Sequence, residues 1–150
     1  MVMTKRKLLR SIDTARVKAA IDNAERRTSG EISVSVARLF WGDVEKAAWK
    51  AFGRLGMTET RERNGVLIFV VPSRRRFVVL GDSGIHARVG QEFWTSVAAH
   101  LSQNFRSGDF TLGLVHAIDE VGKQLAAHFP YSATSDVNEL SNEIDFGPEG

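Results

Sequence analysis

The stretch that decides the fold, residues 64–81, reads NGVLIFVVPSRRRFVVLG. Val66–Val71 is apolar at every position, as expected of a central strand that is buried on both faces. Residues 72–74 make a short turn, and Arg76–Gly81 is a second run of mostly β-branched and aromatic residues. Because the turn is short, we expect the two strands to pair as an antiparallel hairpin.

A third strand precedes this hairpin. Glu31–Leu39 alternates, with β-branched apolar residues on one face and small residues on the other. Residues 43–55 follow with the apolar spacing of a helix, and Asp43 is placed to cap it. A strand that reaches its neighbour through a helix should pair with it in parallel, by a right-handed crossover.

Three further segments have helical spacing of apolar residues: 6–27, 91–104 and 110–128. The element order predicts an α/β fold, a three-layer α/β/α sandwich with a small mixed sheet of three to four strands. We assign residues 1–130 to this domain. Residues 131–150 are polar and acidic, and we expect them to form a disordered tail.

The composition suits a globular domain, with 43% hydrophobic residues. Cysteine is absent, which excludes disulfides, thiol nucleophiles and zinc sites with cysteine ligands. Neither a secretory h-region nor an apolar run long enough to cross a bilayer is visible, so we expect a cytoplasmic location.

Charge is unevenly distributed along the chain. Residues 129–150 hold five acidic residues and no Lys or Arg, which leaves residues 1–128 at +7 within a net charge of +2. A basic body can attract an anionic partner, with the acidic tail as a competitor. Ordinary solubilising charge explains the same pattern and is the favoured interpretation.

Several short sequence motifs resemble those of the TPM domain family. They cover about 100 residues in the family's order. The motifs are Thr28-Ser29-Gly30-Glu31-Ile32, Arg63-Asn64-Gly65-Val66-Leu67-Ile68, Gly81-Asp82-Ser83-Gly84-Ile85, Phe105 through Gly108-Asp109-Phe110, Gly113-Leu114, and Val121-Gly122 through His128-Phe129-Pro130.

The resemblance implies a small α/β/α sandwich. It also implies acid-phosphatase activity and divalent-metal binding in some members, and a part in membrane-protein maintenance or assembly in others. This chain departs from the family in two places: Ser73-Arg74 stands where Asp-Arg is common, and residues 81–86 differ from the usual glycine loop. Many bacterial members carry a signal peptide and a membrane anchor, and neither is visible here.

The directions of the strands predict a polar site independently of the family resemblance. Polar residues at the start of the first two strands and the end of the third should lie together at one end of the sheet. There Glu31 and Asp82 would hold Ca²⁺ or Mg²⁺. Arg63 and Ser83, with the amides of residues 81–84, would bind phosphate. The favoured alternative is structural: the two carboxylates cap turns or pair with Arg61 and Arg63.

Two other features have both a functional and a structural interpretation. Asp109 is a candidate third metal ligand, although a helix N-cap is the favoured role. Arg74, Arg75 and Arg76, near Trp41, are candidates for binding an anionic partner such as nucleic acid or lipid. A solvated turn is favoured for them, and no nucleic-acid-binding signature accompanies the cluster.

The sequence therefore leaves three candidate functions, which follow in order of preference. The first is a binding or assembly module that acts with protein partners, including membrane-associated ones. The second is a phosphatase that depends on a divalent metal, with Glu31, Asp82 and Arg63 in its site. The third is a basic surface for nucleic acid or anionic lipid. No catalytic nucleophile can be assigned.

Overall fold

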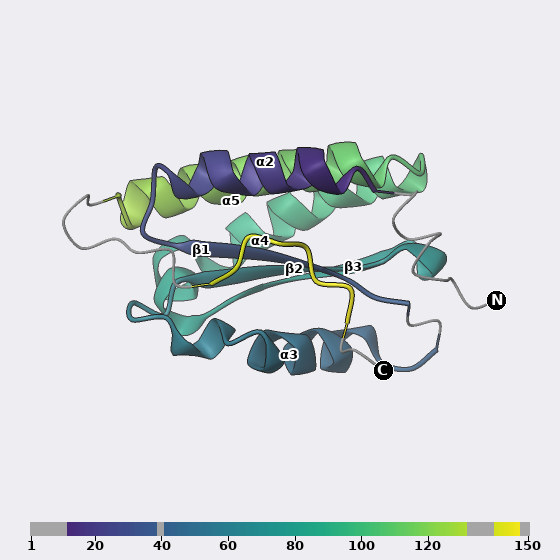
Figure 1. Ribbon diagram of the computed structural model, residues 1–150, viewed down its shortest axis with the longest axis horizontal. Coiled ribbons are helices and arrows are strands. Elements are labelled where there is room, and N and C mark those ends of the chain that lie inside the picture. Colours follow the sequence, from purple (N-terminus) through teal and green to yellow (C-terminus); the bar gives the residue numbers. More distant parts are fainter. Residues whose placement is uncertain (1–11, 39–40, 132–139, 148–150) are drawn as a thin grey trace.

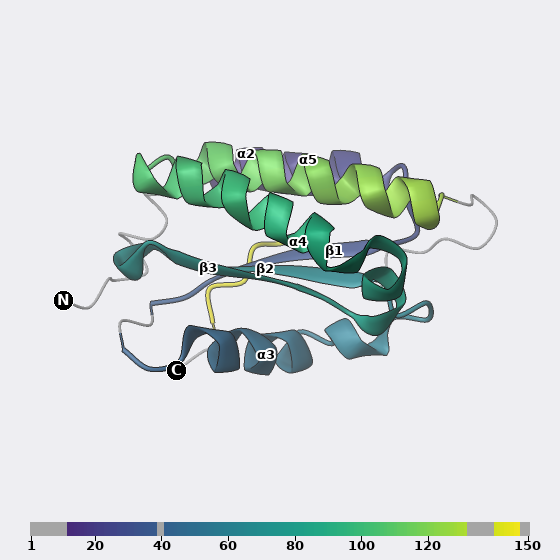
Figure 2. The ribbon, with the colours of Figure 1, turned by 180° about the vertical axis from the view of Figure 1, so that it is seen from behind.

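The computed structural model describes residues 12–38, 41–131 and 140–147, and shows the three layers expected from the element order (Figure 1). A mixed sheet lies between two layers of helices, one on each of its faces (Figure 2). The α/β class is confirmed.

The sheet has the order β1-β2-β3. Its strands are Glu31–Val36 (β1), Gly65–Val71 (β2) and Arg76–Gly81 (β3). β1 pairs with β2 in parallel, with Glu31 beside Gly65, and β3 pairs with β2 antiparallel. Every residue of β2 is buried, as its continuous apolar run predicts.

Each face of the sheet has its own core. Helix α3 (Val44–Arg54) covers one face, where Phe52, Met57 and Leu67 are buried. Helices α2 (Thr14–Glu25), α4 (Ser83–Arg106) and α5 (Phe110–His128) cover the other face with a larger core. Short 3-10 turns at Met57–Glu59 and Pro72–Arg74 complete the connections.

Two helix boundaries differ from the predicted ones. Asp13 caps α2 by accepting a hydrogen bond from the Arg16 amide at 3.1 Å, so this helix begins at Thr14. Residues 6–11, where we expected the helix to begin, lie outside the described residues. Helix α4 begins at Ser83, eight residues earlier than expected, and is interrupted at Gly90. The backbone of Gly90 has φ 75° and ψ 174°, which glycine tolerates and other residues do not.

The expected disordered tail is wrong for residues 140–147. This segment, which we call the strap, crosses the outer edge of β1 (Figure 1). Val36 donates to the Asp145 carbonyl at 2.8 Å, and the Asp145 amide donates to Val34 at 3.0 Å. The strap also packs Ile144 and Phe146 against the larger core.

The Asp145 side chain is fixed as firmly as its backbone. Arg54 on α3 donates two hydrogen bonds to its carboxylate, at 2.7 and 3.1 Å, and Ser35 donates a third at 2.7 Å. Burial alone would raise the pKa of Asp145, but the bonds from Arg54 and Ser35 outweigh burial and hold the pKa below its usual value. The acidic strap residue is therefore structural. Residues 132–139 and 148–150 lie outside the described residues.

We expect Asp145→Ala to lower the free energy of unfolding by about 1–3 kcal/mol, because it leaves Ser35 and Arg54 without their acceptor. Glu143→Ala is the control: Glu143 is exposed and lies 3.6 Å from Lys18. Its loss should cost less than about 0.5 kcal/mol. Urea denaturation measures both, and equal effects would contradict the role given to Asp145.

Candidate functional site

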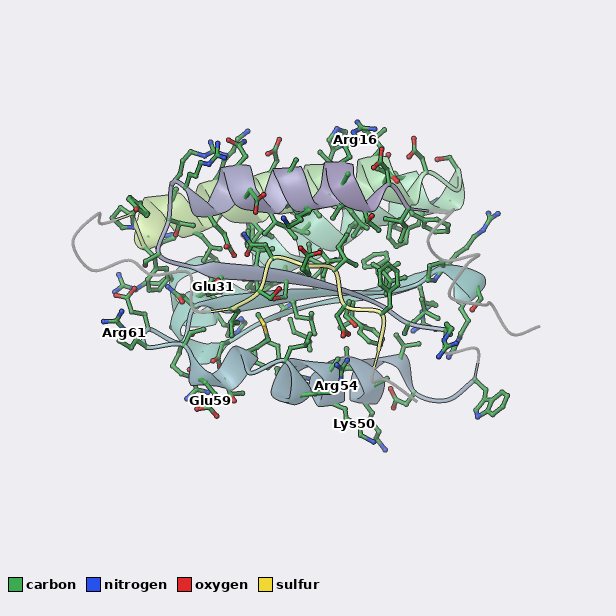
Figure 3. All side chains as sticks on the ribbon, in the orientation of Figure 1. Arg16, Glu31, Lys50, Arg54, Glu59 and Arg61 are labelled. Atoms are coloured by element: carbon green, nitrogen blue, oxygen red, sulfur yellow. The ribbon has the colours of Figure 1, made fainter. Side chains whose placement is uncertain are left out.

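The strand register gathers the predicted polar residues at one end of the sheet. Glu31 opens β1 beside Gly65, while Gly81 closes β3 opposite Val66. Arg63 and Asn64 directly precede β2, and Asp82 directly follows β3. Glu31, Glu59 and Arg61 are all labelled at this end of the molecule in Figure 3. Strand polarity thus predicted the grouping correctly.

Asp82 is fully engaged within this group. Arg63 donates to it through Nε at 2.6 Å and through Nη2 at 2.9 Å. These bonds to Asp82, together with the charge of the Asp82 carboxylate, raise the pKa of Arg63 above its usual value. Asp82 Oδ1 also accepts from the Ser83 amide at 2.8 Å and caps α4. Pairing and capping, the structural alternative, is what the geometry shows for Asp82.

The backbone amides after Asp82 are also occupied, so the predicted anion nest at residues 81–84 is wrong. The amides of Gly84 and Ile85 donate to the Arg63 carbonyl at 2.8 and 3.2 Å. The two glycines instead permit close packing. A Cβ at Gly84 would lie 2.1 Å from the Glu62 carbonyl oxygen, and one at Gly81 would lie 2.3 Å from the Trp94 ring.

Glu31 belongs to a buried carboxyl pair that sequence reasoning missed. Glu31 is 2% exposed, and its partner is Glu25 at the end of α2. Burial, followed by the charge of Glu31, raises the pKa of Glu25 to about 9, while Glu25 Oε2 accepts from the Ile32 amide at 2.8 Å. A pKa of about 9 keeps the Glu25 carboxyl protonated at neutral pH, beside Glu31. Glu25 is four residues after Ile21 on the apolar face of α2, a signal that could have identified it.

Asp109 does not join these residues. It caps α5, where its Oδ1 accepts from the Leu112 amide at 3.0 Å. The far end of α5 leads to Phe129, whose carbonyl accepts the Thr28 hydroxyl near the start of β1. The 19 residues of the helix therefore separate Asp109 from Glu31 and Asp82, and the expectation that it completes their metal site is wrong.

Across the described ranges, 12–38, 41–131 and 140–147, no three His, Asp or Glu residues are grouped so that they could hold a metal. A Ca²⁺ or Mg²⁺ site at Glu31 and Asp82 stays a prediction, as does phosphate binding by Arg63 and Ser83. The chemistry of the donors does not favour either role, because Asp82 and Arg63 already bind each other.

The arginine cluster lies at the opposite end of β3. Arg74 Nη1 donates to the Gly42 carbonyl at 2.8 Å, and Arg75 Nη1 donates to the Arg106 carbonyl at 3.1 Å. These two side chains thus fasten the hairpin turn to neighbouring segments. Arg75 and Arg76 remain exposed, which leaves their charge available to an anionic partner.

An open cleft of about 430 Å³ lies beside β3, and the sequence analysis did not anticipate it. Its lining comes from three elements: Trp49 on α3; Val79, Leu80 and Gly81 on β3; and Asp82, Ser83, His86, Gln91 and Trp94 at the start of α4. Trp94 Nε1 donates to His86 Nδ1 at 3.0 Å across the Gly90 kink. The cleft was missed because the helix was expected to begin only at residue 91, after Asp82, Ser83 and His86.

The sequence profile of the TPM domain matches residues 2–124. The chain belongs to the TPM domain family. The family recognised from the short motifs is thereby confirmed over most of the chain. No curated protein matches the chain.

Solved structures support the TPM assignment. The NMR structure of the BA42 protein from the psychrophilic bacterium Bizionia argentinensis is similar, with a TM-score of 0.83 and 37% identity, over 90% of this chain and 92% of that chain. Two further structures share the fold alone. They are the N-terminal domain of a P. gingivalis protein (TM-score 0.63, 17% identity, 88% and 99% covered) and that of the cg2496 protein from Corynebacterium glutamicum (0.57, 15%, 91% and 79%).

Because some TPM family members act with membrane proteins, a helix with the length and hydropathy of a membrane span would bear on the function of this chain. Within the part of the chain that the structure describes, none of the helices combines the length and the hydropathy needed to cross a bilayer.

We expect Gly84→Ala to destabilise the fold by about 3 kcal/mol or more, because the added methyl group collides with two backbone carbonyls. Gly53→Ala is the matched control, since a Cβ there meets no atom within 4 Å inside α3. It should stabilise the protein by about 0.5–1 kcal/mol. Thermal unfolding compares the two, and a Gly84→Ala protein as stable as the wild type would contradict the packing role.

The carboxyl pair predicts a dependence of stability on pH. Because folding raises the pKa of Glu25 from 4.5 to about 9, wild-type stability should fall as pH rises through this range. The slope should reach at most about 1.4 kcal/mol per pH unit, the value for one proton.

Glu25→Gln should remove this slope and make the protein more stable than the wild type at pH 8, because its amide can donate where the shared proton does. Glu92→Gln on the exposed surface of α4 is the control and should keep the wild-type slope. Unfolding by urea at several pH values measures this. An unchanged slope in Glu25→Gln would show that the pair shares no proton.

Proposed function

We propose that the protein is a binding module whose protein partner docks in the cleft between α3 and α4. The observation that carries this proposal is the cleft itself, in which two tryptophans and a few polar groups surround an open space. Docking sites for partners commonly combine aromatic anchors with hydrogen-bonding groups in this way.

Trp49 is the residue best placed to anchor a partner. It is 48% exposed although it borders the cleft, and its ring packs edge-to-face on Phe52 at 5.3 Å between centroids. The packing fixes the orientation of the ring, so that little side-chain entropy is lost on binding. Trp94 is 6% exposed and also lines the cleft.

The phosphatase alternative has less support. The guanidinium proposed to hold phosphate, on Arg63, is neutralised by Asp82. The carboxylate proposed to hold the metal, on Glu31, lies beside a second carboxyl in a buried position. A role in assembling membrane-associated partners, which the family resemblance implies, is compatible with a docking cleft and forms the finer part of this proposal.

Site-specific photocrosslinking in cells tests the docking site. A photoreactive residue at position 91, in the cleft, should crosslink one partner protein reproducibly. The same residue at position 16, on the outer face of α2 (Figure 3), should not crosslink it.

We expect Trp49→Ala to reduce the crosslink at least about tenfold, as loss of an anchoring aromatic residue does. Trp41→Ala is the control, because Trp41 is 70% exposed but does not line the cleft. Crosslinking that is equal from both positions, or insensitive to Trp49→Ala, would refute the cleft as the docking site.

A further inference from the structure

β3 is the outer strand of the sheet next to the cleft. The Asp82 amide donates to Gly65, so the pairs two residues apart along the ladder, such as Leu80 with Leu67, carry the hydrogen bonds to β2. The intervening residues Phe77, Val79 and Gly81 therefore direct their N–H and C=O groups away from β2. Within residues 12–38, 41–131 and 140–147, no hydrogen bond occupies these outward groups.

The opposite edge of the same sheet, formed by β1, is partly covered by the strap. There the strap pairs with β1 through the backbone of Asp145, and Arg54 binds the Asp145 carboxylate. An acidic segment of this chain thus already covers part of one sheet edge, with two backbone hydrogen bonds to Val34 and Val36 and one arginine. The β3 edge has the same two components, outward backbone groups and exposed arginines, without a covering segment among the described residues.

The surroundings of β3 define what would fit. Arg75 and Arg76 are exposed where the strand begins, and the cleft with Trp49 and Trp94 lies where it ends. Figure 2 shows β3 running between α4 and α3 on this side of the molecule. The strand of six residues is about 20 Å long, so one short extended segment reaches both features.

Building on the proposed function, we infer that the partner presents an extended acidic peptide segment that pairs with β3 as a fourth strand. Its backbone would bind Phe77, Val79 and Gly81, its acidic residues would meet Arg75 and Arg76, and an apolar side chain would enter the cleft. A membrane surface or a nucleic acid would satisfy the arginines but leaves the alternating backbone donors and acceptors unmatched.

Two synthetic peptides, EEVTVTV and VTVTVEE, probe this pairing. If the peptide runs parallel to β3, the glutamates of EEVTVTV lie beside Arg76. If it runs antiparallel, the glutamates of VTVTVEE lie there. We expect one of them to bind and to slow amide hydrogen exchange at Phe77, Val79 and Gly81 by about tenfold or more. The same peptide with N-methylated backbone amides should bind at least about tenfold more weakly, because it lacks the donors for the ladder.

Protein variants supply the matched comparison. Val79→Pro removes one outward N–H on an edge strand, where proline is tolerated, and should weaken the peptide about tenfold. Val79→Thr keeps that N–H and should bind like the wild type. Arg76→Glu should weaken binding several-fold, whereas Arg16→Glu on α2 should not.

Equal binding of the N-methylated and unmodified peptides to the wild type would overturn strand pairing, whatever the variants do. Binding of neither peptide would overturn it as well. In both cases a crosslink from position 91 that depends on Trp49 would leave the docking cleft standing. Peptide binding without such a crosslink would support strand pairing at β3 and refute the docking cleft.

Discussion

The whole architecture depends on β2, the strand whose seven residues are all buried. Its even-numbered residues face one core and its odd-numbered residues face the other, so that one strand organises both layers of helices. Its backbone is satisfied by β1 on one side and β3 on the other. Every other element is placed relative to this strand, including the end of the sheet where the polar residues gather.

That polar end illustrates how charge is used inside a small domain. Arg63 and Asp82 form a two-point ion pair that also caps a helix, and the Arg63 carbonyl accepts the next two free amides of that helix. Groups that a motif presents as a ligand site thus serve to join β2 to α4. The open cleft adjoins this ion pair beside β3, where two tryptophan rings and polar groups that include Asp82 line the space.

The sequence was informative wherever the determinants are local. The apolar run of β2, the short turn before Arg76 and the capping residues Asp43 and Asp109 each depend on a few neighbouring residues, and all were predicted. The features that the sequence did not predict share a different cause. The strap, the Glu25–Glu31 pair and the cleft depend on contacts between segments far apart in the chain, to which composition and periodicity are blind. The strap was misjudged because its charges suggest disorder, whereas Arg54 neutralises the one that is buried.

The position of the strap has a consequence for biosynthesis. It follows the described helices and strands along the chain, so the ribosome produces it after the strand that it covers. While a nascent chain lacks it, β1 is already able to pair with β2, but the outward backbone groups of Val34 and Val36 lack the partners that Asp145 later supplies. An uncovered strand of this kind can pair with a neighbouring polypeptide, as partly synthesised domains do when they aggregate. The time between synthesis of β1 and synthesis of the strap therefore sets how long each new molecule stays vulnerable to misassembly.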